Sequence, residues 1–188
     1  MRRLTLVAAI SLLPTVVAAQ DMFNGMQPTY EEPKRSFQVW GGMMIPAFNY
    51  STYVDDIGWN AGAAFIIKPQ RYFHVRLEGE YNSIGFQGSI PGSATNYGGG
   101  IGGGRSLSNG RGMTTEGYLV AGLYNTDVCV PNLTGSCNTK SELQFGTKIG
   151  FNAVVGRGRV RPVFNMYWLY TWGSPYVSFI PITVGLRF

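Results

Sequence analysis

The clearest pattern along the chain is an alternation of apolar and polar residues with a period of two. In the last stretch, Tyr176–Phe188, one face carries Ile180, Ile182, Val184, Leu186 and Phe188, and the other face carries mostly small or polar residues. Successive side chains of a β-strand point to opposite faces, so this stretch predicts a strand with one continuously apolar face.

The stretch 73–82 shows the same alternation with all of its charges on one side. Its two faces are Phe73, Val75, Leu77, Gly79, Tyr81 and His74, Arg76, Glu78, Glu80, Asn82. Five further stretches alternate in the same way: Phe37–Met44, Gly58–Lys68, Met113–Tyr124, Ser141–Val155 and Val160–Trp172. The connections between the stretches alternate in length, with short turns near Gln70, Gly110 and Gly158 and longer loops near Asn49, Ile90 and Cys129. The pattern predicts an all-β protein built of hairpins.

The charged residues of the predicted strands occupy the phase opposite the apolar face. Eight residues share this phase: Arg76, Glu78, Glu80, Glu116, Glu142, Lys148, Arg161 and Arg187. A soluble lipocalin-like barrel would have the reverse polarity, with apolar side chains inside and polar side chains outside. A charge on the lipid face at mid-membrane costs about 2–4 kcal/mol, so we predict that all eight point into a barrel whose apolar face meets lipid.

The first 19 residues have the features of a secretory signal peptide. Arg2 and Arg3 precede an apolar run, and Val17-Ala18-Ala19 forms a small-residue cleavage site, so the mature chain is expected to begin near Gln20. Residues 20–35 are polar and carry no periodicity, which predicts a partly disordered periplasmic lead-in to a barrel domain at 36–188. No later stretch is apolar enough for a membrane-spanning helix.

The composition agrees with a strand-rich membrane protein. The chain has 26 Gly, 11 Tyr and 11 Phe, and only 13% of its residues are charged. Without Arg2 and Arg3 the mature chain carries 13 basic and 10 acidic residues, a net charge of +3. The basic residues are scattered along the sequence, and no run indicates a nucleic-acid partner.

Two stretches resemble the small eight-stranded outer-membrane β-barrels of the opacity-protein and outer-membrane-protein-A-like family: Gly117–Tyr124 and the terminal strand that closes on Phe188. The resemblance implies an eight-stranded antiparallel up-and-down transmembrane β-barrel, exported to the bacterial outer membrane and monomeric. It also implies short turns in the periplasm and longer loops outside. The expected partners are outer-membrane lipids and the assembly machinery, which would recognise Phe188.

The glycine-rich segment Asn96–Leu107 has three interpretations. By itself it looks like a flexible linker or, weakly, a phosphate-binding loop, but it lacks a Lys-Ser/Thr end and a following helix N-terminus. Single-chain bacterial barrels have an even number of strands, and the other stretches number seven. We therefore predict that this segment is the remaining strand.

The chain has two cysteines, Cys129 and Cys137, which bracket a segment rich in Pro, Asn and Gly. In a secreted chain such a pair predicts a disulfide that closes a surface loop. A metal site would need more ligands, and the single histidine lies far away in sequence.

No motif in the sequence points to catalysis or to a cofactor. His74 is the one candidate base, and no nucleophile–base–orienter set can be assembled around it, so a satisfied interior histidine is expected. The sequence predicts a non-enzymatic barrel that is plugged by its side chains, with a structural role or a surface ligand bound through its outer loops. Two alternatives stay open: a narrow porin-like channel past inward glycines 62, 122, 146, 150 and 185, and a lipid-modifying enzyme.

Overall fold

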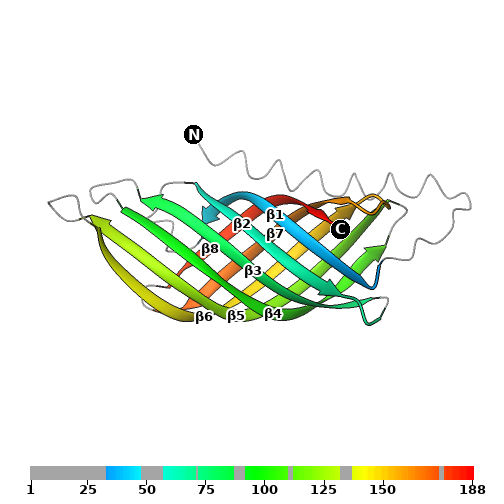
Figure 1. The fold of residues 1–188 in the computed structure, drawn as a ribbon, viewed down its shortest axis with the longest axis horizontal. Coiled ribbons are helices and arrows are strands. Elements are labelled where there is room, and N and C mark those ends of the chain that lie inside the picture. Colours follow the sequence, from blue (N-terminus) through cyan, green and yellow to red (C-terminus); the bar gives the residue numbers. More distant parts are fainter. Residues whose placement is uncertain are drawn as a thin grey trace, which may run out of the picture. The chain divides into compact units, whose positions relative to one another are not determined.

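The computed structural model describes residues 33–47, 57–70, 72–86, 92–109, 112–131, 137–173 and 176–188. The predicted signal peptide and nearly all of the predicted lead-in lie outside these residues. The described chain forms eight strands (Figure 1): β1 Arg35–Pro46, β2 Gly58–Ile67, β3 Phe73–Phe86, β4 Gly92–Asn109, β5 Met113–Pro131, β6 Cys137–Val155, β7 Arg161–Trp172 and β8 Ser178–Arg187.

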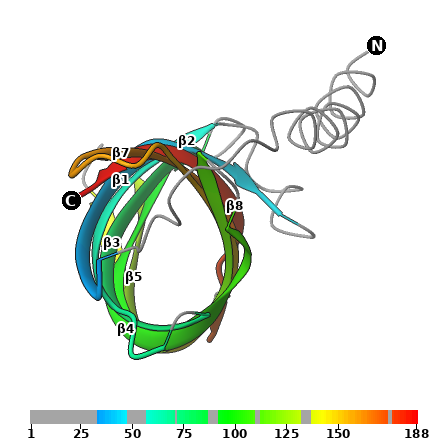
Figure 2. The ribbon, with the colours of Figure 1, turned by 90° about the vertical axis from the view of Figure 1, so that its right-hand side faces the viewer.

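The eight strands close into one antiparallel barrel in sequence order. Figure 2 shows the closed ring in an end-on view. Strand β1 pairs with β8, which leaves no open sheet edge along the closed part of the wall. Following cross-strand partners around the ring from Ser36 leads back to β1 at Pro46, ten residues further along. This stagger tilts the strands against the barrel axis, and eight strands enclose an interior just wide enough for side chains. None of the described residues belongs to a helix that could cross a membrane.

The two ends of the barrel differ. The odd-numbered strands begin and the even-numbered strands end at one end, which we call the turn end; consecutive strands there are separated in the sequence by 68–72, 110–112 and 156–160. The odd-numbered strands end and the even-numbered strands begin at the other, the loop end, where the separating stretches are 47–57, 87–91, 132–136 and 173–177. The expected alternation in length holds only for the connection 47–57, which has eleven residues. The connections 87–91, 132–136 and 173–177 have five residues each, no more than 68–72 and 156–160, because strands β3 to β6 continue into stretches that were expected to be loops. Most residues of the loop-end connections, including 48–56, lie outside the described residues.

The glycine-rich segment is a strand, as the strand count predicted. Strand β4 pairs with β3 from Phe73–Arg105 to Phe86–Gly92 and with β5 along most of its length. Strands β5 and β6 are both longer than expected, because backbone pairing continues where the outward pattern turns polar. Cys129 and Cys137 consequently belong to strand ends rather than to the loop between them.

The outer wall is apolar, as the alternation predicted. For example, the exposed fraction is 59% for Leu77, 56% for Ile149 and 59% for Val184. Aromatic side chains gather at both ends of this wall. Near the loop end lie Trp59, Tyr81, Tyr97, Trp168, Tyr170, Trp172 and Tyr176, in two groups of stacked or edge-on rings. Near the turn end lie Phe37, Phe73 and Phe188, each about half exposed.

Candidate functional site

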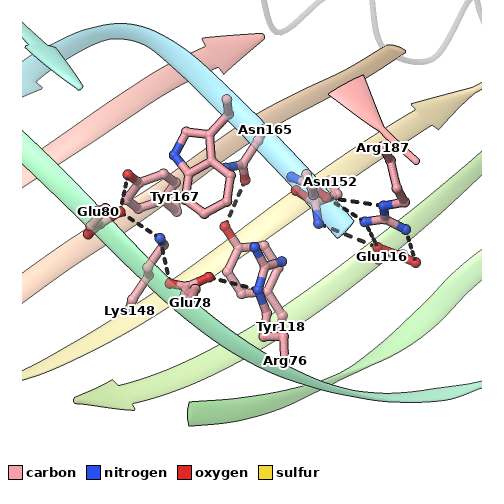
Figure 3. Close-up of polar contacts among 12 residues, drawn as sticks. Arg76, Glu78, Glu80, Glu116, Tyr118, Lys148, Asn152, Asn165, Tyr167 and Arg187 are labelled. Atoms are coloured by element: carbon pink, nitrogen blue, oxygen red, sulfur yellow. Dashed lines mark hydrogen bonds and ion pairs between the residues drawn. The ribbon is translucent and has the colours of Figure 1, made fainter. Parts of the chain in front are cut away.

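The inner wall of the barrel is lined by polar and charged side chains. Seven of the eight charged residues predicted to point inward are buried there: Arg76, Glu78, Glu80, Glu116, Lys148, Arg161 and Arg187. Glu142 has the same phase but is half-buried near the loop end, and no ion pair within the described residues includes it. Figure 3 shows that most of the buried set falls into two separate groups.

The first group is centred on Lys148 of β6, and we call it the Lys148 cluster. The Lys148 ammonium lies 2.6 Å from Glu78 Oε1 and 2.8 Å from Glu80 Oε2. Arg76 Nε lies 2.7 Å from the other oxygen of Glu78, and the Tyr167 hydroxyl donates to Glu80. All four charged side chains have no exposed surface, so each charge relies on its partners for the stabilisation that water would otherwise give.

Aromatic rings add to the stabilisation of the two cations in the Lys148 cluster. The Lys148 ammonium lies 3.7 Å from the centre of the Tyr167 ring, and the Arg76 guanidinium lies 4.0 Å from the centre of the Tyr118 ring. Tyr118 is in turn fixed by donating a hydrogen bond of 2.7 Å to Asn165. Such cation–π contacts are strongest where water is excluded, as it is for these buried groups.

The second group, the Glu116 cluster, lies closer to the turn end. Arg187 donates two hydrogen bonds to the Glu116 carboxylate, at 2.9 and 2.6 Å, and Lys68 reaches Glu116 Oε1 at 2.7 Å. Arg187 also donates to Gln38 Oε1, and Asn152 donates to Glu116 at 3.4 Å. The paired contact of Arg187 with Glu116 is the geometry in which a guanidinium binds a carboxylate most strongly.

A belt of hydrogen bonds between neutral side chains crosses the inner wall nearer to the loop end. It contains one residue from each strand from β1 to β7: Trp40, Asn60, Asn82, Asn96, Thr126, Gln144 and Thr171. The belt ends where the Val177 backbone N–H donates to Thr171. Next to it lies an apolar cluster that includes Met44, Ile84, Leu169 and Phe179.

Three of the five inward glycines are covered by large side chains, and the other two lie against backbone. A Cβ at Gly62 would overlap the Trp40 ring, one at Gly146 the Tyr124 ring, and one at Gly150 the Tyr118 ring. A Cβ at Gly185 would meet the backbone at Val39 and Trp40. Gly122 differs, since its nearest atoms belong to the backbone of Gly99 and Gly100.

His74 is buried in the interior, as expected, but it is not the satisfied histidine that was expected. The side chain is only 1% exposed, and neither ring nitrogen has a hydrogen-bond partner within the described part of the chain. The ring lies against Gly104, where a Cβ would overlap Nε2. The expectation failed because the nearby carboxylate, Glu116, is taken by Arg187 and Lys68.

The predicted disulfide stays a prediction. The backbones of β5 and β6 pair Cys129 with Thr139 and Pro131 with Cys137, so both cysteines lie in the same two-stranded ladder. The side chain of Cys137 lies outside the described residues.

The charged side chains of the interior mainly contact one another. Within the described ranges, no three His, Cys, Asp or Glu residues form a group that could hold a metal ion. The carboxylates of Glu78, Glu80 and Glu116 all have cations as partners. His74 contacts no hydroxyl or thiol that it could activate, according to the hydrogen bonds of the described residues.

Several members of these groups were not identified from the sequence, although their phase is inward. Lys68 closes the predicted strand Gly58–Lys68 but was not counted among the inward charges, and Gln38 and Tyr167 carry no charge that would single them out. The belt was missed as well, although Asn60, Asn82 and Asn96 all share the inward phase. An excess of Asn at inward positions near one end of three neighbouring strands is the signal that would have found it.

No protein-family model matches the sequence, and no curated protein matches it either. Solved structures do match the fold. Ail, the attachment invasion locus protein of Yersinia pestis, was crystallised with the heparin analogue sucrose octasulfate; it is 16% identical, with a TM-score of 0.50 over 82% of this chain and 96% of Ail.

Two further solved structures are similar. Neisserial surface protein A is 13% identical, with a TM-score of 0.53 over 82% of this chain and 96% of its own. A major outer membrane protein from Thermus thermophilus is 11% identical, with a TM-score of 0.57 over 83% and 99%. At these identities the likeness concerns the fold. This chain has the closed eight-stranded fold of the small outer-membrane β-barrels.

Proposed function

We propose that this protein is a non-enzymatic integral β-barrel of the bacterial outer membrane, exported through a cleaved signal peptide. The main support for the proposal is the polarity of the barrel wall: the apolar side chains face outward and the ion pairs face inward. A barrel in water would expose the charges and bury the apolar residues instead. Burial of the two clusters is tolerable because nearly every charge has a partner, whereas the exposed outer wall requires lipid.

The dimensions of the outer wall support a membrane location. On β3, Phe73 near the turn end and Tyr81 near the loop end are eight residues apart. At a tilt near 45°, this length of strand spans ~20 Å along the barrel axis. The aromatic residues therefore flank a band close to the apolar height of about 25 Å found in outer-membrane barrels.

Fractionation of cells that express the full chain tests the membrane proposal. We expect the protein in the outer-membrane fraction, with a mature chain that starts near Gln20 by mass spectrometry. Recovery mainly from the soluble periplasm would contradict the proposal and favour a soluble barrel.

We further propose that the interior is plugged. Trp40, Tyr118 and Tyr124 cover inward glycines, and ion pairs of the Lys148 and Glu116 clusters join strands three places apart in the ring. Purified protein in planar bilayers should therefore give no steady single-channel steps. Stable steps that change when Glu78 is replaced by Ala would favour the narrow channel instead.

The terminal residue supports the expected use of the assembly machinery. Phe188 exchanges two backbone hydrogen bonds with Phe37 of β1, at 3.1 and 2.8 Å, and its side chain is 49% exposed on the outer wall. The aromatic ring is thus presented outward at the seam where the barrel closes. Phe188→Asp should lower the folded yield in cells while the purified variant still refolds in detergent; normal yield in cells would contradict this role.

The loop end is the proposed site for any surface ligand. Its described charged residues include Asp127, Glu142 and Lys140, and the sequence adds Asp55 and Asp56 in the first loop. This balance is acidic, so a sulfated saccharide such as the one bound by Ail is not proposed for this chain. When the proteins are immobilised, heparin binding by the unmodified barrel should be no stronger than heparin binding by the Asp127→Asn variant. Tight, salt-sensitive heparin binding by the unmodified protein would contradict this part of the proposal.

A further inference from the structure

The fold collects basic residues that are scattered in the sequence at the turn end of the barrel. Seven described residues at this end are basic: Lys34, Arg35, Lys68, Arg105, Arg157, Arg159 and Arg161. The same connections also contain Arg71 and Arg111, which lie outside the described residues. No Asp or Glu occurs in the segments 33–36, 67–73, 104–113 and 156–162. The expectation of scattered charge therefore holds for the sequence but fails for the folded chain.

Two of these basic residues face inward, and at least two face outward. Lys68 and Arg161 are buried, whereas Arg35 and Arg105 are exposed and are followed on their strands by buried Ser36 and Ser106. Because side chains alternate along a strand, Arg35 and Arg105 must lie on the outer wall. Lys34 and Arg159 are exposed in the segments that lead into β1 and β7.

The outward cations lie at the level of the aromatic residues of the turn end. Arg105 is the direct cross-strand partner of Phe73, and Arg35 is two residues from Phe37 on the same face of β1. Phe37 and Phe73 are 46% and 56% exposed. A long cationic side chain beside an aromatic residue at the edge of an apolar wall reaches the plane of the phosphates with its stem still against lipid.

We infer that Lys34, Arg35, Arg105 and Arg159, which we call the basic rim, bind the headgroups of anionic phospholipids in the leaflet at the turn end. This inference rests on the proposed membrane location. Arg35 lies on β1, Arg105 on β4 and Arg159 next to β7, so the rim is spread around the whole circumference of an eight-stranded ring. A partner docked against one side of the barrel cannot contact all of these residues, whereas a ring of lipids around the wall does.

The described residues of the loop end show no comparable excess of basic side chains. Its strand residues include one basic residue, Lys140, with two acidic residues, Asp127 and Glu142. The described strands therefore present a basic rim to the leaflet at the turn end and not to the leaflet at the loop end. Each Lys or Arg held near an anionic surface increases binding about fivefold, and the effect falls off with added salt.

The test compares lipids retained by the purified, folded full chain in mixed micelles that contain equal amounts of phosphatidylglycerol and phosphatidylcholine. Native mass spectrometry should show phosphatidylglycerol enriched at least fivefold at low salt. The triple variant Arg35→Gln, Arg105→Gln, Arg159→Gln should lose most of this enrichment. The matched control, Thr139→Glu with Lys140→Glu at the loop end, changes the net charge by the same three units and should keep it.

The outcomes separate this inference from the proposed function. Folding in lipid is detected as a heat-dependent shift on electrophoresis. If the chain folds in lipid but does not enrich phosphatidylglycerol, the inference alone is contradicted. If the chain does not fold in lipid, the membrane proposal is contradicted. Equal loss in the triple variant and the control would mean a net-charge effect, which also contradicts the rim. Displacement of the lipid by soluble polyglutamate would indicate an acidic protein partner instead.

Discussion

Lys148 and Ile149 are neighbours on β6, yet they lie in opposite environments. Lys148 is fully buried between two carboxylates and two aromatic rings, and Ile149 is 56% exposed on the outer wall. The inner wall is held by specific pairs, so the loss of one partner leaves another group uncompensated. The outer wall needs only to be apolar, so many residues would serve at each of its positions.

The largest effect is expected from breaking the Lys148 cluster. Lys148→Met keeps the length of the side chain but leaves Glu78 and Glu80 with Arg76 as the remaining cation of the cluster. Removing one partner of a buried ion pair costs about 3–5 kcal/mol. Urea unfolding of the barrel in vesicles measures this cost, and Thr147→Met on the same strand is the control. A cost below 1 kcal/mol would mean that water already compensates these carboxylates.

A charge added to the outer wall should cost somewhat less. Ile149→Arg places a cation in the apolar band and should destabilise the barrel by about 2–4 kcal/mol in a bilayer. The conservative change Ile149→Leu should be close to neutral under the same conditions. If Ile149→Arg were also neutral, the outer wall at this height would face water, and the membrane assignment would fail.

Two glycine-to-alanine variants, one on each wall, test how tightly the inner and outer walls are packed. Gly150→Ala puts a Cβ into the Tyr118 ring on the inner wall and should cost about 1–3 kcal/mol through overpacking. Gly103→Ala lies on the outer wall, where the nearest atom to a new Cβ is the His74 carbonyl oxygen at 3.5 Å. This second change should be neutral or slightly stabilising, since Ala restricts the unfolded chain. Equal costs at the two positions would show that the interior is not tightly packed.

The smallest effect is expected at the cysteines. If Cys129 and Cys137 are linked, non-reducing peptide mapping should give one linked pair and no free thiol. Cys129→Ser with Cys137→Ser should leave the barrel folded, because the β5–β6 ladder continues for many residues below this point. Loss of membrane insertion in the double variant would mean that the link is needed for the fold.

The strands and their facing could be predicted because a period of two is a local property. On β7, the alternation within Val160–Trp172 puts Phe164, Met166 and Trp168 on the apolar face, and all three are exposed. Strand ends were harder to predict, and β6 begins at Cys137 rather than Ser141. Its outward residues there, Thr139 and Ser141, are polar, so the alternation that marks a strand disappears while backbone pairing continues.

The pairing inside the barrel could not be predicted from the same pattern. The sequence placed Glu80 and Lys148 on the inner wall, but their contact joins residues 68 positions apart. It depends on the ten-residue stagger of the closed ring, which brings β3 and β6 side chains to one height. The unsatisfied nitrogens of His74 follow from the same long-range geometry, because two cations from other strands reach Glu116.

The sequence by itself determined that this chain has strands with one apolar and one charged face, because alternation needs nothing beyond neighbouring residues. It also determined that the charged face is the inner one, since the cost of charges in lipid leaves no other arrangement. Only the tertiary structure decided which charges meet in the Lys148 and Glu116 clusters and that Arg35, Arg105 and Arg159 share one rim. Closure of the ring sets the height of every residue, and this height is a property of all eight strands together.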